Sequence, residues 1–368
     1  MYKALFTADI HASNSLPFAQ RDPHSMISDR LKDTISVLDE MRKFAVVSGV
    51  EHIWVLGDLV DKRIIDAVTL KSVTAALKQM LDDGLRIFLL PGNHEACDAK
   101  ARHSILDAYS SMGITVFAAP EWLATASFKP DRLPSGMCFG ALPFQPDDVV
   151  AAVLDSWSGA ARSEPFVVML HQSIIGGRIG SWVCPEGIDQ ELLEPFSTTL
   201  AGHFHSPQKL CNGVYYLGAP LQHNFADSGD ERGFWSISID DNGYVKSDMI
   251  PTSLPKFHDV KFTPKTGITG VGFGDYFRIR VCGSDGEVRK KMPQAEELCQ
   301  SLLKNGARYA KAIPHPDSAV NERKARIASE NCSLQAMVAN YIDVCDTAGL
   351  SRGKLESLGR ELVSEAES

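Results

Sequence analysis

The stretch His52-Ile-Trp-Val-Leu-Gly-Asp-Leu-Val-Asp61 decides the fold that we expect for this chain. Its first five residues, His52 to Leu56, predict a buried strand, and Gly57-Asp58 then turns the chain at the end of that strand. Asp58 and Asp61 would therefore lie in a loop at the carboxyl end of a strand, where polar side chains from several loops can converge on one site.

Four further polar clusters end apolar strands in the same way. They are Asp9-x-His11 after Tyr2 to Ala8, Gly92-Asn93-His94-Glu95 after Leu85 to Leu90, His171 after Phe166 to Leu170, and Gly202-His203-x-His205 after Thr199 to Ala201. Imidazole, carboxylate and amide groups together suit two divalent transition ions, because a carboxylate can bridge both. One such motif is weak evidence, since a lone buried histidine is more often a core residue. Five of them in one chain favour a metal site.

Short apolar runs alternate with amphipathic stretches over the first 250 residues, which predicts an α/β or α+β domain of layered sheets and helices. Helices are expected from Arg30, capped by Asp29, to about Val47 and from about Ala67 to Leu81. The remaining strands of this domain are expected at Thr115 to Phe117, Met137 to Ala141, Val214 to Leu217 and Gly233 to Ile239.

A smaller module follows the proline-containing stretch Pro251 to Pro255. Its pattern predicts a βαβ-like unit with a strand at Tyr276 to Val281, a helix at Gln294 to Lys304 stopped by Gly306, and a strand at Arg308 to Ile313. Two amphipathic helices are expected after Pro314-His315-Pro316: one carrying Leu334, Met337, Val338, Tyr341 and Ile342, and one capped by Ser351. We therefore divide the chain into residues 1–255, 256–318 and 325–368.

The composition is that of a folded globular chain, with 44% hydrophobic and 23% charged residues among 368. No apolar run approaches the roughly 18 residues of a membrane span, and the N-terminus has no basic region, so neither a membrane anchor nor a signal peptide is expected. The eight cysteines have no CxxC spacing. We expect no zinc ribbon and no disulfide framework, and a reducing cytoplasm, bacterial or that of a phage-infected host.

The five motifs, in this order, resemble those of the calcineurin-like metallophosphoesterase superfamily over about residues 1 to 240. The resemblance implies a double-sheet sandwich flanked by helices, and two-metal hydrolysis of a phosphoester. It also implies that Asp58 bridges the two ions. The implied ligands are Asp9, His11, Asp58 and His205 for one metal, and Asp58, Asn93, His171 and His203 for the other.

Three residues beside these ligands receive supporting roles. By the resemblance, His94 lies near the leaving group without binding metal, as a general acid or transition-state stabiliser. Glu95 is expected to orient His94 or to cap the following turn, and Asp61 to hydrogen-bond a ligand or to face solvent. Mn²⁺ is the metal that we expect first, with Mg²⁺, Fe²⁺ and Zn²⁺ as alternatives.

Within the superfamily, the chain most resembles the SbcD-type DNA double-strand-break nucleases of bacteria and phages. The resemblance rests on Gly57 to Asp61, Tyr216 to Gln222 and Gly229 to Phe234, and on the order of a small module before C-terminal helices. It implies an exonuclease and endonuclease of DNA repair and recombination, with residues 256–318 as a DNA-capping domain. It further implies that residues 325–368 grip the coiled coil of an SMC-like ATPase of the SbcC type, and it allows a homodimer.

Two positions depart from the pattern of these nucleases. Ala219 stands where many members have serine, and Asp61 stands where eukaryotic and archaeal relatives often have histidine. The second departure leaves the part that Asp61 plays in substrate handling open. The terminal helices also have an alternative interpretation, in which they fold back onto the nuclease core.

The net charge of −9 disfavours binding of a polyanion over the whole surface. Residues 278–326 are an exception, with 11 basic and 6 acidic side chains. A solvated helix face is the alternative interpretation of this basic segment. The candidates for contact with DNA are Arg278, Arg280, Arg289, Lys290, Lys291, Arg323, Lys324 and Arg326.

Two other functions fit the same motifs. A phosphomonoesterase or a cyclic-nucleotide phosphodiesterase can use this set of ligands, because the metals recognise phosphate and not the rest of the substrate. Such an enzyme would have little need for residues 260–368. A non-catalytic interaction module of the same fold would be favoured by the loss of metal ligands, and this sequence has lost none.

Overall fold

The computed structural model describes residues 1–97, 103–124, 137–240, 242–243, 245–263, 273–316, 351, 353–355 and 357–359. The chain divides into two compact units, Met1–His258 with Gly272–Tyr276, and Asp259–Val271 with Phe277–Ser368. Most of residues 325–368, the third segment expected from the sequence, lies outside the described residues.

The first sheet of the first unit contains six strands, of which β1 to β4 run parallel. β13 pairs antiparallel with β1, and β14 pairs antiparallel with β13. In order across the sheet, the strands are β14 (Val245–Pro251), β13 (Gly233–Ile239), β1 (Tyr2–Thr7), β2 (His52–Leu56), β3 (Arg86–Leu90) and β4 (Thr115–Val116).

The second sheet also contains six strands, and its four central strands run parallel. The two edge strands, β11 and β5, pair antiparallel with their neighbours. In order across the sheet, the strands are β11 (Gln208–Cys211), β12 (Val214–Tyr216), β10 (Thr198–Gly202), β7 (Phe166–His171), β6 (Cys138–Leu142) and β5 (Glu121–Ala124).

The two sheets pack face to face, because alternate residues of each strand point to opposite faces. In β2, Trp54 and Leu56 enter the core between the sheets, whereas Ile53 and Val55 face the helices. Trp54 stacks on Phe88 of the neighbouring strand, with ring centroids 4.4 Å apart. The strand that was expected from sequence therefore lies at the centre of the sandwich.

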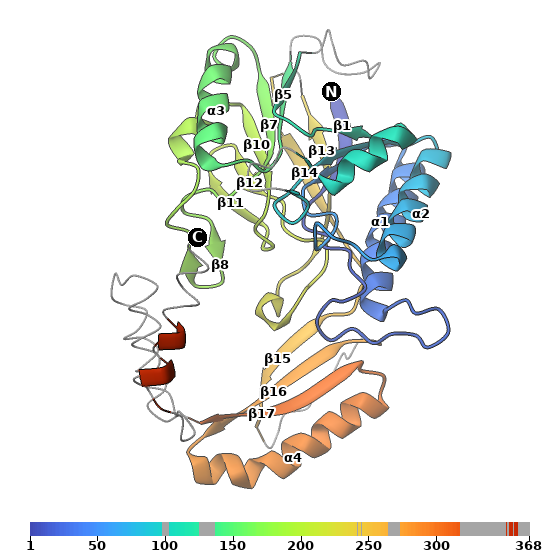
Figure 1. Ribbon diagram of the computed structural model, residues 1–368, viewed down its shortest axis with the longest axis vertical. Coiled ribbons are helices and arrows are strands. Elements are labelled where there is room, and N and C mark those ends of the chain that lie inside the picture. The colour runs from blue at the N-terminus through green and yellow to red at the C-terminus, as the bar shows by residue number, and fades with distance from the viewer. Residues whose placement is uncertain are drawn as a thin grey trace. The chain divides into compact units, whose positions relative to one another are not determined.

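Helices cover both outer faces of the sandwich (Figure 1). α1 (Asp29–Ser48) and α2 (Ala67–Asp82) pack on the first sheet, and α3 (Asp147–Ala161) packs on the second. This arrangement confirms the mixed α/β double-sheet sandwich with flanking helices. The N-cap of α1 is Ser28 and not Asp29, because the side chain of Ser28 accepts a hydrogen bond from the Leu31 amide. The helix therefore begins at Asp29, one residue earlier than expected.

Short elements complete the first unit. They are η1 (Ile105–Met112), the two-stranded sheet of β8 (Arg178–Ile179) and β9 (Trp182–Val183), η2 (Gln190–Leu193) and η3 (Phe225–Asp227). Among the helices that the structure describes, none has both the length and the apolar character needed to cross a bilayer.

The second unit has its own small core. β15 (Phe257–Lys261), β16 (Tyr276–Gly283) and β17 (Tyr309–Pro316) form a three-stranded sheet, on which α4 (Asp285–Lys304) packs (Figure 1). α4 begins nine residues before the expected Gln294, because Ser284 and Glu287 form a capping box and Pro293 is accommodated inside the helix. In the tail, residues 353–355 and 357–359 are helical; the expected helix carrying Leu334 to Ile342 lies outside the described residues.

Candidate metal centre

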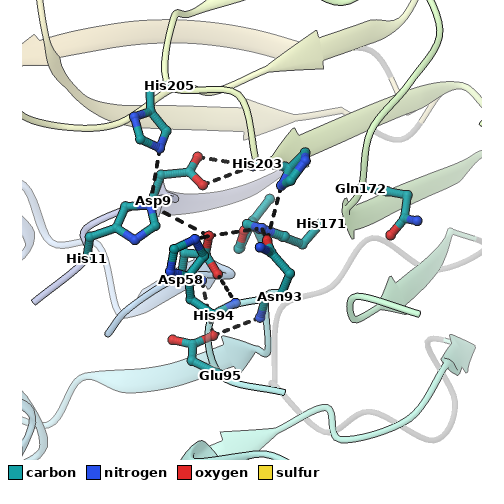
Figure 2. Close-up of polar contacts among 12 residues, drawn as sticks. Asp9, His11, Asp58, Asn93, His94, Glu95, His171, Gln172, His203 and His205 are labelled. Carbon is teal, nitrogen blue, oxygen red and sulfur yellow. Dashed lines mark hydrogen bonds and ion pairs between the residues drawn. The ribbon is translucent and has the colours of Figure 1, made fainter. Parts of the chain in front are cut away.

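The five polar clusters meet at one end of the sandwich. Asp9, Asp58 and Asn93 follow β1, β2 and β3, which are parallel neighbours in the first sheet. His171 ends β7 and His203 follows β10, which are parallel neighbours in the second. Because the carboxyl ends of parallel strands lie on the same edge, each sheet presents its polar loops together. Figure 2 shows the resulting cluster of carboxylates and imidazoles.

Backbone strain is concentrated at this cluster. Of the six non-glycine residues with positive φ in the described part of the chain, four are expected ligands: Asp9, His11, Asp58 and His203. Each such conformation costs of the order of 1–3 kcal/mol and persists only where surrounding contacts enforce it. Asp9 illustrates the enforcement, since its amide donates to Gly57 O at 3.0 Å while its carboxylate accepts two bonds from the His203 amide.

Asp58 occupies the centre of the cluster. Its Oδ2 atom lies 3.6 Å from His11 Nε2 and 3.4 Å from His171 Nε2. Its Oδ1 atom accepts a hydrogen bond from the His94 amide at 3.1 Å, which fixes the orientation of the carboxylate. One oxygen therefore faces imidazoles from both sheets, as a bridging ligand must.

One group of donors lies on the His11 side of Asp58. His11 Nε2 and His205 Nε2 approach to 3.2 Å, and donor atoms of Asp9, His11 and His205 all lie within 4.8 Å of one another. Burial raises the pKa of Asp9 to about 6, and burial lowers the pKa of His11 to about 3. His11 is therefore neutral near pH 7, the state in which imidazole binds metal.

A second group lies on the His171 side. Asn93 Oδ1 lies 3.1 Å from both His171 Nε2 and His203 Nδ1. His171 Nδ1 donates to the Leu56 carbonyl at 2.8 Å, which directs Nε2 into the cluster. Burial also lowers the pKa of His203 to about 3, so this imidazole too is neutral.

Asp58 and His171 form a charged pair inside the protein. Burial alone would lower the pKa of His171, but the Asp58 carboxylate outweighs it and raises that pKa to about 9. Burial likewise opposes ionisation of Asp58, but His171 holds the pKa of Asp58 below its usual value. A metal ion at this position would compete with the proton on His171 Nε2.

Glycines bring the loops close enough to form the cluster. A Cβ atom on Gly57 would lie 2.0 Å from His171 Nδ1, and Gly57 has a φ of +88°. A Cβ atom on Gly92 would lie 2.1 Å from Asp58 Oδ1. These two positions exclude any side chain, because the contacting atoms belong to two expected ligands.

Glu95 supports the cluster through the backbone and not through the His94 side chain. Its buried carboxylate accepts hydrogen bonds from the amides of Asp58, Val60 and Gly92. It therefore ties the loop after β2 to the loop after β3. Burial, reinforced by the Asp58 charge, raises the pKa of Glu95 to about 7.

Asp61 and His94 lie beside the cluster and are less buried than Asp58. His94 Nδ1 donates to the Asp61 carbonyl at 2.6 Å, and the side chain of His94 is 39% exposed. The Asp61 carboxylate lies 3.7 Å from His11 Nδ1 and 3.9 Å from His94 Nδ1. Asp61 thus faces the site through both its backbone and its side chain, although its carboxylate makes no short contact with either imidazole.

The donor set fits two divalent ions. Two carboxylates, one amide oxygen and four imidazoles converge, and Asp58 is shared between the two groups. Mixed nitrogen and oxygen donors of this kind suit Mn, Fe and Zn. The residues present therefore form a dimetal-binding site, and the structure brings together every ligand that the motifs implied.

His223 is a further histidine beside this cluster, and it was not among the expected ligands. Its place in the sequence, close behind the Gly202-His203-x-His205 motif, favours a role in a turn or in packing, with a place lining the cleft as the alternative. In the structure its ring lies against two expected ligands, with centroids 5.1 Å from His11 and 4.9 Å from His205. No spacing rule identifies it, because its hydrogen bond to Asp9 joins residues 214 positions apart.

The basic residues expected to contact DNA fall into three groups. Arg278 and Arg280 pair with Asp259 at 2.7 and 2.8 Å, so part of their charge is neutralised within the second unit. Arg289 and Lys290 are exposed on α4, and Lys291 beside them is half-buried. The remaining candidates, Arg323, Lys324 and Arg326, lie outside the described residues.

Comparison with solved structures gives distant likenesses. A dimetal phosphatase from Danio rerio matches with a TM-score of 0.43 at 12% identity, covering 67% of this chain and 98% of that one. A purple acid phosphatase from yellow lupin matches with a TM-score of 0.38 at 12% identity, covering 67% and 51%. At these identities neither indicates a substrate for this chain. No curated protein matches it significantly.

A family model gives the decisive comparison. The model of the calcineurin-like phosphoesterases matches residues 2–207, a range that contains every expected metal ligand. The superfamily that was inferred from the order of the motifs is therefore confirmed. Because the match spans more than half of the 368 residues, the chain belongs to the calcineurin-like phosphoesterase family.

Proposed function

We propose that this metal-dependent phosphoesterase is a DNA nuclease that hydrolyses phosphodiesters, with exonuclease and endonuclease activity. In this proposal it is the nuclease subunit of a DNA repair or recombination complex, with an SMC-like ATPase of the SbcC type as its partner. Mn²⁺ is the metal proposed for both positions.

The second unit is the observation that carries the proposal. His205 is the last expected metal ligand along the chain. The second unit, which follows it, has a sheet and a helix, α4, with their own core. Arg289 and Lys290 are exposed on that helix, and lysine and arginine side chains gain binding energy by neutralising phosphates along a duplex. A hydrolase of small phosphoesters would have little use for such an addition.

The residues divide the chemical work between them. Two bound divalent ions would polarise the phosphate and supply an activated water. His94 is proposed to donate a proton to the departing oxygen, and its bond to the Asp61 carbonyl holds the ring while leaving Nε2 available. The exposed side chain of His94 suits contact with a substrate, whereas the buried His11 and His171 suit metal binding.

A nuclease assay with substrate controls tests the proposal. The full chain would be supplied with Mn²⁺ and offered DNA with defined duplex and single-stranded ends, a mononucleotide and a cyclic nucleotide. We expect cleavage of DNA and little hydrolysis of the two small substrates. Faster hydrolysis of the mononucleotide would favour a phosphomonoesterase, and faster hydrolysis of the cyclic nucleotide would favour a small-molecule phosphodiesterase.

If the chain were inactive towards all of these substrates, its bound manganese would be measured. Two bound manganese ions in an inactive chain would favour the non-catalytic interaction module. A His94→Ser variant provides the matched control for an active chain, because it removes the proposed proton donor and leaves every metal ligand in place. Its DNA cleavage should fall by about 10²–10⁴-fold.

A further inference from the structure

His223 makes a direct hydrogen bond to the backbone of a metal ligand. Its Nε2 atom lies 2.9 Å from the carbonyl oxygen of Asp9, and because a carbonyl only accepts, Nε2 carries the proton. The residue is 8% exposed, and its other nitrogen, Nδ1, finds no hydrogen-bond partner among the residues that the structure describes. The hydrogen bond to Asp9 therefore fixes the tautomer of the ring.

The Asp9 carbonyl is a strained part of the site. Asp9 has a φ of 56°, a conformation that residues other than glycine seldom adopt. Gly57 O accepts from the Asp9 amide on one side, and His223 Nε2 donates to its carbonyl on the other. These two bonds define the peptide planes on either side of the Asp9 Cα atom, and so the direction in which its carboxylate points.

The same ring contacts the two imidazoles that share an ion with Asp9. The His223 ring meets the His11 ring edge-on, at an interplanar angle of 89°. It is tilted against the His205 ring at an interplanar angle of 58°. Within the described part of the chain, His223 makes no hydrogen bond, ion pair or ring contact with Asn93, His171 or His203. The contacts of His223 are thus with the ligands of one metal position, the one formed by Asp9, His11 and His205.

His223 is itself fixed by buried charged groups. Its amide donates to Asp227 Oδ2 at 2.7 Å, and Asp227 is in turn paired with Arg232 at 3.0 Å. Arg30, which is 1% exposed, donates to the carbonyls of Gln222 and His223, both at 3.2 Å. The backbone on both sides of the ring is therefore anchored before any metal binds.

We propose that His223 is a positioning residue for the metal held by Asp9, His11 and His205, acting through the Asp9 carbonyl and the two rings. The proposal rests on the dimetal centre and is independent of whether the substrate is DNA. It predicts that loss of the Nε2 hydrogen bond weakens binding of one ion while sparing the other.

Two amide substitutions separate the hydrogen bond from packing. In His223→Gln the amide nitrogen can occupy the place of Nε2 and donate to Asp9 O. In His223→Asn the side chain is one methylene shorter, so its amide nitrogen reaches only the place of Nδ1. We expect His223→Asn to weaken the binding of one of the two manganese ions by about 10–100-fold. His223→Gln should retain most of the affinity for that ion.

Manganese titration of the metal-free protein, followed by electron paramagnetic resonance, measures both ions separately from activity. Equal weakening of both ions, equal effects of the two amides, or unchanged affinity in His223→Asn would each overturn the proposal. His52→Asn and His52→Gln are the controls, because His52 is a buried histidine of β2 that bonds to Tyr2 at the opposite end of the strand. They should change the melting temperature and leave manganese affinity unchanged.

A measurement on the unmodified protein covers the case in which His223→Asn does not fold. Nitrogen-15 spectra of histidine-labelled protein identify which ring nitrogen carries the proton, with His223→Gln assigning the signal. We expect a proton on Nε2 of His223. A proton on Nδ1 alone would remove the bond to Asp9 and overturn the proposal.

Discussion

Asp58 is the residue on which both halves of the metal centre depend, because one carboxylate oxygen lies within 3.6 Å of imidazoles from both groups. We expect Asp58→Asn to lose tight binding of both ions and to reduce phosphodiester hydrolysis to background. The loss should exceed the ~10–100-fold that is typical of residues which only support a ligand. Elemental analysis after gel filtration measures the bound metal.

The control for Asp58→Asn is His94→Ser, which should keep two ions per chain while losing most of its activity. Two ions retained in Asp58→Asn, together with activity, would contradict the assignment of Asp58 as the shared ligand.

The pKa of His171 sets the pH dependence of metal binding. Because Asp58 raises that pKa to about 9 against burial, the ring is protonated at neutral pH in the metal-free chain, and an ion must displace one proton. Affinity for the ion held by His171 should rise by about tenfold per pH unit from pH 7 to 8 and level off above 9. Manganese titrations at constant ionic strength check this, and an affinity that fell as the pH rose would contradict it.

The raised pKa of His171 affects the stability of the metal-free fold in the opposite direction: stability falls as the pH rises. The folded pKa of His171 is raised above its ordinary value of 6.5, so its contribution to stability is complete below pH 6.5 and is lost as the pH rises through about 9. Unfolding without metal should therefore become easier over the range in which metal binding becomes tighter.

At the scale of elements, the sequence predicts those helix and strand bounds that depend on neighbouring residues in the chain. The bounds of β2 were predicted correctly, because a short, largely apolar run and the glycine after it are features of the sequence itself. The start of α4 was placed too late, at Gln294, because the capping box of Ser284 and Glu287 was not taken into account. The hydrogen bond of His223 to Asp9 was not predicted for a different reason: it depends on how distant loops meet, which no local pattern encodes.

The loop after β3 must pass close to the loop after β2, and Gly92 allows that approach. In Gly92→Ala the new Cβ would meet Asp58 Oδ1 at 2.1 Å and the Asp58 amide nitrogen at 2.7 Å, so the backbone has to move. We expect a destabilisation of about 1–3 kcal/mol, together with weaker metal binding. Denaturant unfolding without metal and manganese titration measure the two effects.

Gly159→Ala is the matched control. Gly159 lies within α3, where a Cβ atom would meet nothing within 4 Å, so alanine should stabilise the protein by up to about 1 kcal/mol. Unchanged manganese affinity in Gly92→Ala would show that the two loops can separate without disturbing Asp58.

At the scale of the whole molecule, the metal centre and the second unit have separate cores. The centre is built from residues up to His223, whereas the core of the second unit is formed by residues such as Phe277, Ile279 and Leu302. Substitutions on the surface of one unit should therefore leave the folding of the other unchanged. This separation allows substrate binding to be tested apart from chemistry.

Reversing charge at Arg289 and Lys290 tests whether the second unit binds DNA. Both are exposed on α4, whereas Lys291 is left unchanged because its ammonium lies 3.4 Å from Cys282 O. Each lost phosphate contact should lower the salt dependence of duplex binding by about 0.9 in the log–log slope. Hydrolysis of a small chromogenic phosphodiester should be unchanged, since it needs only the metals and His94.

Reversal of Lys71 and Lys78 on α2 is the control of equal charge, and it should leave the salt slope as it is. If the α4 variant lost activity equally on DNA and on the small diester, the change would have acted through the fold or the metal centre. If neither the DNA rate nor its salt slope changed, Arg289 and Lys290 would belong to a solvated helix face. Only a loss confined to DNA, with a shallower slope, assigns the basic face of α4 to substrate binding, because counterion release requires direct contact with phosphates.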